Sequence, residues 1–102
     1  MNKFVFLYEG GQEPTSAEGQ KASMEIWNQW FAGLGESVVE MGVPMGTGRS
    51  VDGTGATEAE VAVNGYSVIQ ASDMDEAVKL AEGCPVVTEG GLVHVYPAMA
   101  MA

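Results

Sequence analysis

His94 is the only histidine of the chain, and its side chain is the one best suited to acid–base chemistry. A histidine exchanges protons near neutral pH, so it can serve as a general acid or a general base. It stands in an apolar, branched segment typical of a β-strand, between Leu92 and Tyr96. We therefore predict His94 as the candidate catalytic residue. The alternative, which the pattern favours, is a strand histidine that is hydrogen-bonded inside a contact between subunits.

Four further side chains are candidates for substrate binding. Tyr66 and Tyr96 each combine a hydroxyl with an aromatic ring, and Gln70 adds an amide, so they could line a pocket together with His94. Arg49 is the only arginine and lies beside a loop with two glycines, where it could hold a carboxylate or a phosphate. Such loops are common, so an ordinary surface arginine is the favoured alternative.

Neither a metal site nor a cofactor site is predicted. One histidine and one cysteine without clustered partners do not make a ligand set. Cys84 follows the expected end of a helix, where the helix dipole disfavours a thiolate. We interpret it as a small buried hydrophobic residue.

The totals fit one domain over residues 1–102 with a modest core. Four basic against fourteen acidic side chains give a net charge of −10, which disfavours nucleic acids and anionic membranes as partners. No apolar run approaches the roughly 20 residues of a membrane-spanning helix. The first residues pass directly into a strand pattern without a signal-peptide pattern, so we expect a cytoplasmic protein.

Six regular segments are predicted along the chain. Residues 3–8, 37–41, 61–71 and 91–96 read as strands, with Asn64 and Gly65 as a bulge or turn in the third. One helix is expected to start at Thr15, with Glu18 completing a capping box, and to end near Gly35. The second is expected to start at Ser72, with Asp75 as the partner three residues later. Residues 42–60 read as a loop or a glycine-interrupted hairpin arm.

Each helix shows an apolar stripe that we expect to be buried. The stripe of the first helix comprises Met24, Trp27, Trp30, Phe31 and Leu34. That of the second comprises Met74, Ala77, Val78, Leu80 and Ala81. The order of the segments, β-α-β-β-α-β, predicts a ferredoxin-like α+β fold, with a four-stranded antiparallel sheet and two helices on one face.

The alternation of strand side chains predicts what lies on the other face of the sheet. Small aliphatic side chains suit the face beneath the helices, which would leave a large aromatic set on the helix-free face. That set comprises Phe4, Phe6, Tyr8, Tyr66, Val68 and Tyr96. Aromatic rings bury about 150–250 Å² each, so an uncovered patch of this size indicates a contact surface. We predict a homodimer in which the helix-free face of one subunit packs on the helix-free face of the other.

The second half of the chain resembles the YCII-related (DGPF) family. The resemblance is carried by three segments: residues 65–77 with their Gly-Tyr start and Asp-Glu-Ala end, residues 81–85 with their Cys-Pro, and residues 91–97. The first half agrees in outline, through its N-terminal strand and its tryptophan-bearing helix. The resemblance implies a dimeric α+β barrel.

The chain also departs from that family. Members proposed to be enzymes look to use a histidine on the first helix with a nearby aspartate, but residues 21–27 contain no histidine. The Asp-Gly-Pro-Phe signature is replaced by Asp52-Gly53-Thr54-Gly55. These departures put an inherited catalytic mechanism in doubt.

Two functions are compatible with the sequence. The first is a small dimeric α+β barrel that binds a small organic molecule in a pocket at the sheet face, or transforms it by cofactor-free proton shuttling of the isomerase, lyase or dechlorinase kind. The second is a non-catalytic accessory module for a protein partner. The missing helix histidine favours the second, whereas His94 on an aromatic face favours the first.

Overall fold

The computed structural model describes residues 1–11, 15–60 and 62–99. Its elements, in chain order, are β1 (Asn2–Glu9), α1 (Ala17–Leu34), a 3-10 turn (Gly35–Ser37), β2 (Val38–Glu40), β3 (Arg49–Asp52), β4 (Gly55–Glu58), β5 (Val63–Ala71), α2 (Met74–Glu82), α3 (Pro85–Thr88) and β6 (Leu92–Pro97). None of the described helices is both long enough and apolar enough to span a membrane.

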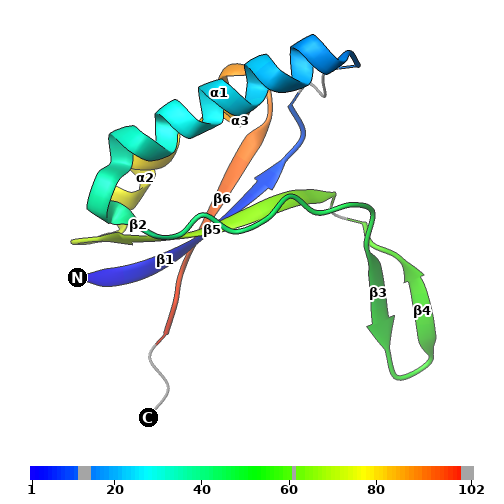
Figure 1. Ribbon diagram of the computed structural model, residues 1–102. Coiled ribbons are helices and arrows are strands. Elements are labelled where there is room, and N and C mark those ends of the chain that lie inside the picture. Colours follow the sequence, from blue (N-terminus) through cyan, green and yellow to red (C-terminus); the bar gives the residue numbers. More distant parts are fainter. Residues whose placement is uncertain (12–14, 61, 100–102) are drawn as a thin grey trace.

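The main sheet has the strand order β2-β5-β1-β6, and every neighbouring pair is antiparallel. The helices cover one face of this sheet, and the other face carries none (Figure 1). The predicted ferredoxin-like α+β fold is therefore confirmed. We call the helix-free surface the open face. It carries alternate residues of three strands: Lys3, Val5, Leu7, Glu9, Tyr66, Val68, Gln70, Leu92, His94 and Tyr96.

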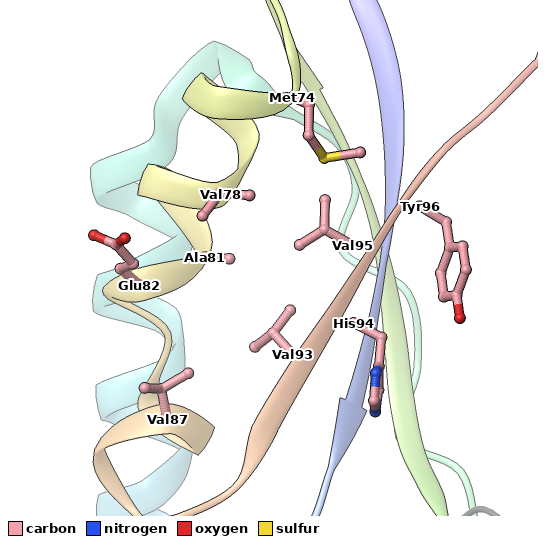
Figure 2. A pocket seen from close by; sticks show the side chains of 9 residues that line it. All are labelled: Met74, Val78, Ala81, Glu82, Val87, Val93, His94, Val95 and Tyr96. Atoms are coloured by element: carbon pink, nitrogen blue, oxygen red, sulfur yellow. The ribbon is translucent and has the colours of Figure 1, made fainter.

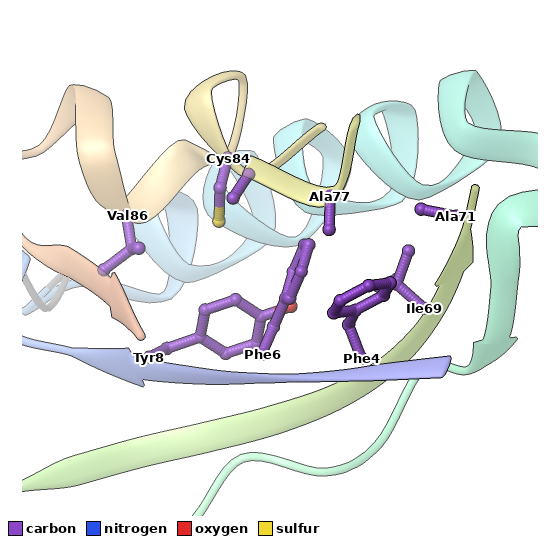
Figure 3. Close-up of a cluster of buried hydrophobic side chains, with 9 residues drawn as sticks. Phe4, Phe6, Tyr8, Ile69, Ala71, Ala77, Cys84 and Val86 are labelled. Carbon is purple, nitrogen blue, oxygen red and sulfur yellow. The ribbon is translucent and has the colours of Figure 1, made fainter. Parts of the chain in front are cut away.

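The face predicted for β1 is wrong. Phe4, Phe6 and Tyr8 are at most 5% exposed and point toward the helices, so Val5 and Leu7 occupy the open face instead (Figure 3). The prediction that small side chains of the sheet lie beneath the helices did not consider the size of the helix side chains that face them. The part of the helix layer formed by α2 and the residue that follows Gly83 is lined by small residues, which leaves room for the large rings of β1. These small residues are Ala77, Ala81 and Cys84.

The predicted faces of the other two strands are consistent with the structure. On β5, Ser67, Ile69 and Ala71 are fully buried while the alternate residues are partly exposed. On β6, Val93 and Val95 pack against the core. The predicted aromatic set on the open face is therefore reduced to two tyrosines, accompanied by aliphatic residues.

Both helices begin one residue later than predicted. Ser16, not Thr15, caps α1 by accepting a hydrogen bond from the backbone N–H of Gly19 at 3.0 Å. Asp73 caps α2 through the N–H of Glu76 at 2.8 Å, and Ser72 donates its hydroxyl to the Glu76 carboxylate instead. At both places two neighbouring residues can act as caps, so the sequence leaves the boundary open by one position.

The predicted helix stripes are only partly buried. Trp27, Trp30 and Leu34 of α1 pack against the core, as do Ala77 and Ala81 of α2. In contrast, Met24 is 65% exposed, and Val78 and Met74 are 40% and 38% exposed. These three residues line hollows in the surface rather than the core.

Two features of the connections matter for function. β3 and β4 form a separate two-stranded hairpin that extends away from the main sheet, on the side opposite the helices (Figure 1). This agrees with the hairpin alternative for residues 42–60.

The sequence did not predict the short helix α3, which begins directly after Cys84. Pro85 occupies its first position, where the missing backbone N–H costs no hydrogen bond.

Candidate functional site

A pocket of about 460 Å³ lies between α1 and the sheet, and we call it the α1 pocket. α1 forms one side, and the segment after β2 forms another. The adjoining ends of β1 and β5 form the floor. Its volume lies within the range of small-molecule sites in proteins, about 300–1,000 Å³.

The wall of the α1 pocket is aromatic. The rings of Tyr8 and Trp27 meet edge to face with centroids 4.9 Å apart, and Phe31 packs beside Trp27 at 6.0 Å. Met24 completes the apolar surface on the solvent side of α1, and Met41 faces it from the segment after β2. This arrangement offers a ring-shaped or otherwise flat molecule an apolar bed.

Few polar groups reach the α1 pocket. Ser23 and Asn28 of α1 supply a hydroxyl and an amide, and Asn64 of β5 supplies a second amide. The Asn64 amide also donates to the carbonyl of Gly10 at 2.9 Å, which fixes its orientation. Glu89 is the charged residue of the lining. The site can therefore hydrogen-bond a ligand, but it carries no cation to hold an anionic one.

The segment after β2 is fixed to β5 at the mouth of the α1 pocket. Pro44 pairs with Gly65 in a β-bridge, and the N–H of Met45 donates to the carbonyl of Asn64 at 2.7 Å. Gly42 has a φ of 76°, and any Cβ there would collide with the carbonyl of Tyr66. Only glycine permits this close approach, so Gly42 positions the pocket wall.

β5 bulges at this end, as the sequence suggested. Tyr8 pairs with Gly65 and Glu9 pairs with Val63, so Asn64 is the extra residue on β5. A bulge turns side chains out of the regular alternation, and here it brings Asn64 to the pocket.

A buried hydrogen-bond chain lies beneath the α1 pocket. The Tyr8 hydroxyl donates to Oγ of Ser67 at 2.7 Å, and that hydroxyl donates to the backbone carbonyl of Met41, also at 2.7 Å. Burial raises the pKa of Tyr8 well above its ordinary value, so the phenol stays protonated. Tyr8 is thus a neutral structural donor, not a proton-transfer group.

The open face carries a different set of polar side chains. Nε2 of His94 lies 2.6 Å from Oε2 of Glu9, and each side chain is about one-third exposed. Tyr66 and His94 both pair with Leu7, from opposite sides of β1, so two strand spacings separate them, roughly 10 Å. The imidazole of His94 and the phenol of Tyr66 therefore lie on either side of the aliphatic side chain of Leu7.

The remaining open-face groups are tied to β2 and the turn before it. The Tyr66 hydroxyl donates to Oε1 of Glu40 at 2.7 Å, and this hydrogen bond to a carboxylate raises the pKa of Tyr66. The Gln70 amide donates to the carbonyl of Glu36 at 2.7 Å. Tyr96 is 57% exposed. Four of the five predicted site residues thus share the open face, and their roles in binding and catalysis stay predictions.

Arg49 lies apart from the other predicted site residues. It is at the start of β3 on the projecting hairpin, and it is exposed. Within one chain, the structure does not bring it to His94 or Tyr66.

A second hollow is a shallow groove of about 550 Å³ between β6 and α2. Val93 and Val95 point into it toward the helices, whereas His94 and Tyr96 point to the other side of the strand (Figure 2). His94 therefore borders the groove without directing its ring into it.

The sequence belongs to a recognisable family. The family model of the YCII-related domain matches residues 5–102. The chain belongs to the YCII-related family. No protein with a curated description matches the sequence.

Among solved structures, this YCII-related protein is similar to 5-chloro-2-hydroxyhydroquinone dehydrochlorinase from Burkholderia phenoliruptrix, in a complex with 2,5-dihydroxybenzoquinone. The two chains are 16% identical, the match covers 90% of each, and the TM-score is 0.53. At this identity the similarity shows the shared fold.

Cys84 of the YCII-related protein fits the structural interpretation. Its side chain is fully buried in the core, and burial raises the pKa of its thiol to about 11. Among the described residues, no three histidine, cysteine or acidic side chains form a cluster able to hold a metal ion.

Of the residues predicted to bind a substrate, only Tyr66 is in the lining of the α1 pocket, and sequence reasoning missed the rest of it. A signal was present on α1, where Ser23 and Asn28 lie within one turn of Trp27 on an otherwise apolar stripe. The wall that faces them comes from residues 41–44, where the sequence predicted the end of a strand and the start of a loop or hairpin arm.

Proposed function

We propose that this YCII-related protein binds a small, flat, uncharged organic molecule in the α1 pocket. The main support is the pocket itself, which has a volume of about 460 Å³ and a wall formed by Tyr8, Trp27 and Phe31. Its neutral polar groups include a hydroxyl and amides. Such a mixture of apolar wall and few polar groups is typical of ligand sites. This proposal keeps the small-molecule ligand predicted from the sequence and moves its site from the sheet face to the helix side.

The negative charge of the pocket and of the whole chain disfavours anionic ligands. Glu89 lines the pocket, and the chain carries a net charge of −10. An anionic ligand would enter a negative potential and find no cation in the lining, so a neutral hydroxylated ring is favoured over the matching carboxylate. The dihydroxybenzoquinone in the dehydrochlorinase structure is a vinylogous acid that is anionic near neutral pH, so it serves as a second anionic probe and should bind weakly.

The test is a comparison of 2-naphthol, 2-naphthoate and 2,5-dihydroxybenzoquinone, monitored through tryptophan fluorescence and calorimetry. We expect 2-naphthol to bind at least about tenfold more tightly than 2-naphthoate. Ser23→Phe places a ring in the pocket and should abolish binding. Ala22→Phe adds the same ring at the exposed neighbouring position and should leave it unchanged. Equal affinity of both variants would reject the pocket.

The predicted homodimer through the open face is part of this proposal. Its support is the aliphatic strip of Val5, Leu7 and Val68, flanked by Leu92 and Tyr96, which are 56% and 57% exposed. An apolar sheet face of this kind is commonly covered by a partner. Sedimentation equilibrium should find a dimer for the wild type and a monomer for Val68→Asp. A wild type that stays monomeric at micromolar concentration would refute it.

Proton transfer at the open face is the second candidate function, because the His94–Glu9 contact at 2.6 Å provides a positioned acid–base pair. It is tested by incubating the protein with each of the three compounds, whether or not the compound binds in the α1 pocket, and following turnover by NMR. Activity that disappears in His94→Ala but persists in Ala22→Phe would support it. No turnover of any bound compound would leave a binding protein. The cytoplasmic location stays a prediction.

A further inference from the structure

The β3–β4 hairpin, which we call the arm, is not covered by any part of the chain that the structure describes. All residues of both strands are exposed, and they form a separate two-stranded sheet. An isolated two-stranded hairpin is at best marginally stable in water. The arm therefore requires a contact that the single chain does not supply.

The arm has two unlike faces. The register pairs Arg49 with Glu58 and Val51 with Ala56, which places these four side chains on one face. The opposite face has only small polar side chains and glycine: Ser50, Asp52, Gly55 and Thr57. Val51 is 78% exposed, more than any other branched aliphatic residue that the structure describes. The face with Val51 is the one that gains from being covered.

The arm extends on the same side of the sheet as the open face (Figure 1). A molecule lying on the open face would thus lie beside the arm. The open face offers an aliphatic strip, and it also presents the carboxylates of Glu9 and Glu40. A second copy of this chain carries both features, and the carboxylates of Glu9 and Glu40 have the charge that suits contact with an arginine.

We propose that the arm of each copy clasps a second copy, docking Val51 on it and bringing Arg49 to the margin of its open face. This rests on the dimer proposed above and adds the arm as a distinct part of the interface. Arg49, which is remote from His94 and Tyr66 in its own chain, then approaches those residues of the other copy. The polar set of the open face is complete only in the dimer.

The first test is the dimer dissociation constant of full-length variants by sedimentation equilibrium. Val51→Asp places a charge on the docking face and should weaken the dimer at least about tenfold. Ser50→Asp places the same charge on the opposite face of the arm and should change the constant by less than about threefold. Both positions are exposed, so both variants should keep the wild-type circular dichroism spectrum.

The second test detects the contact directly. A nitroxide is attached at Gly53→Cys, at the turn of the arm, where a side chain meets nothing within 4 Å. Mixed with isotope-labelled wild type, it should broaden NMR signals of the open-face strands in the other copy. Absence of such broadening in a dimer, or equal dissociation constants for Val51→Asp and wild type, would overturn the arm contact. If Val68→Asp still dissociates that dimer, the open-face dimer stands without it.

Discussion

The Tyr8 hydroxyl donates to Oγ of Ser67 on the neighbouring strand at 2.7 Å, both groups being buried beneath the helices. This hydrogen bond allows a tyrosine to occupy the core, because its polar end finds an acceptor inside the protein. The Ser67 hydroxyl in turn donates to the backbone carbonyl of Met41. These two hydrogen bonds connect the core beneath the helices to the wall of the α1 pocket.

Ser67→Ala should lower the free energy of unfolding by about 2 kcal/mol, because it leaves the Tyr8 hydroxyl without its acceptor and the Met41 carbonyl without its donor. Tyr8→Phe should cost less, about 1 kcal/mol, since Ser67 keeps its bond to Met41. Urea unfolding of both variants and of the double variant measures the coupling. Strict additivity would show that the two side chains do not act together.

Gly42→Ala should be among the most destabilising single-methyl additions to the chain. The new Cβ would meet the Tyr66 carbonyl on a backbone with positive φ, so the segment after β2 must move away from β5. We expect a loss of at least about 2 kcal/mol and loss of ligand binding. Gly46→Ala, where a Cβ meets nothing within 4 Å, is the control. Equal stability of the two variants would contradict this role of Gly42.

The fold could be predicted because its signals are local and agree with one another. The strand–helix joint around Ser72 and the end of α2 before Cys84 each identify an element from a few residues. The face of β1 could not be predicted in the same way, because its alternation fits either side equally well. Which set of β1 side chains faces the helices depends on the small residues Ala77 and Ala81 of α2, which are far from β1 in sequence.

The site was harder to predict than the fold. His94 could be singled out by type alone, and Glu9 is its partner only because β1 lies beside β6. The α1 pocket depends on residues 41–44 approaching β5, and only Gly42 hints at that approach. Contacts between distant segments are set by the folded chain, and no local pattern encodes them.

Stability should fall in alkaline solution, and Cys84 should account for part of the loss. Its folded pKa of about 11 exceeds the ordinary 9.0, so the folded chain keeps a proton that the unfolded chain releases. Its contribution is fully present below pH 9 and is lost as the pH rises through 11, with a slope of at most about 1.4 kcal/mol per pH unit. Burial of Tyr8 adds to the loss above its ordinary pKa of 10.0.

Denaturant unfolding of the wild type and Cys84→Ala over this pH range measures that effect. The variant lacks the thiol, so its stability should depend less steeply on pH, even if a small cavity lowers it throughout. Parallel curves for the two proteins would show that Cys84 does not titrate differently on unfolding.

His94→Ala should leave the affinity of the α1 pocket unchanged. The ring of His94 is on the open face, whereas the pocket lies on the helix side of the sheet. The variant should also lose less than about 1 kcal/mol of stability, because the pair with Glu9 is partly solvated. Calorimetric titration with 2-naphthol makes the comparison. A large loss of affinity would place the ligand next to His94.

The most direct measurement is a crystal structure of the protein soaked with 2-naphthol. The account predicts ring-shaped density between Trp27 and Met41, with its hydroxyl within hydrogen-bond distance of Ser23, Asn28 or Asn64. Density between two open faces beside His94, with the α1 pocket empty, would contradict it.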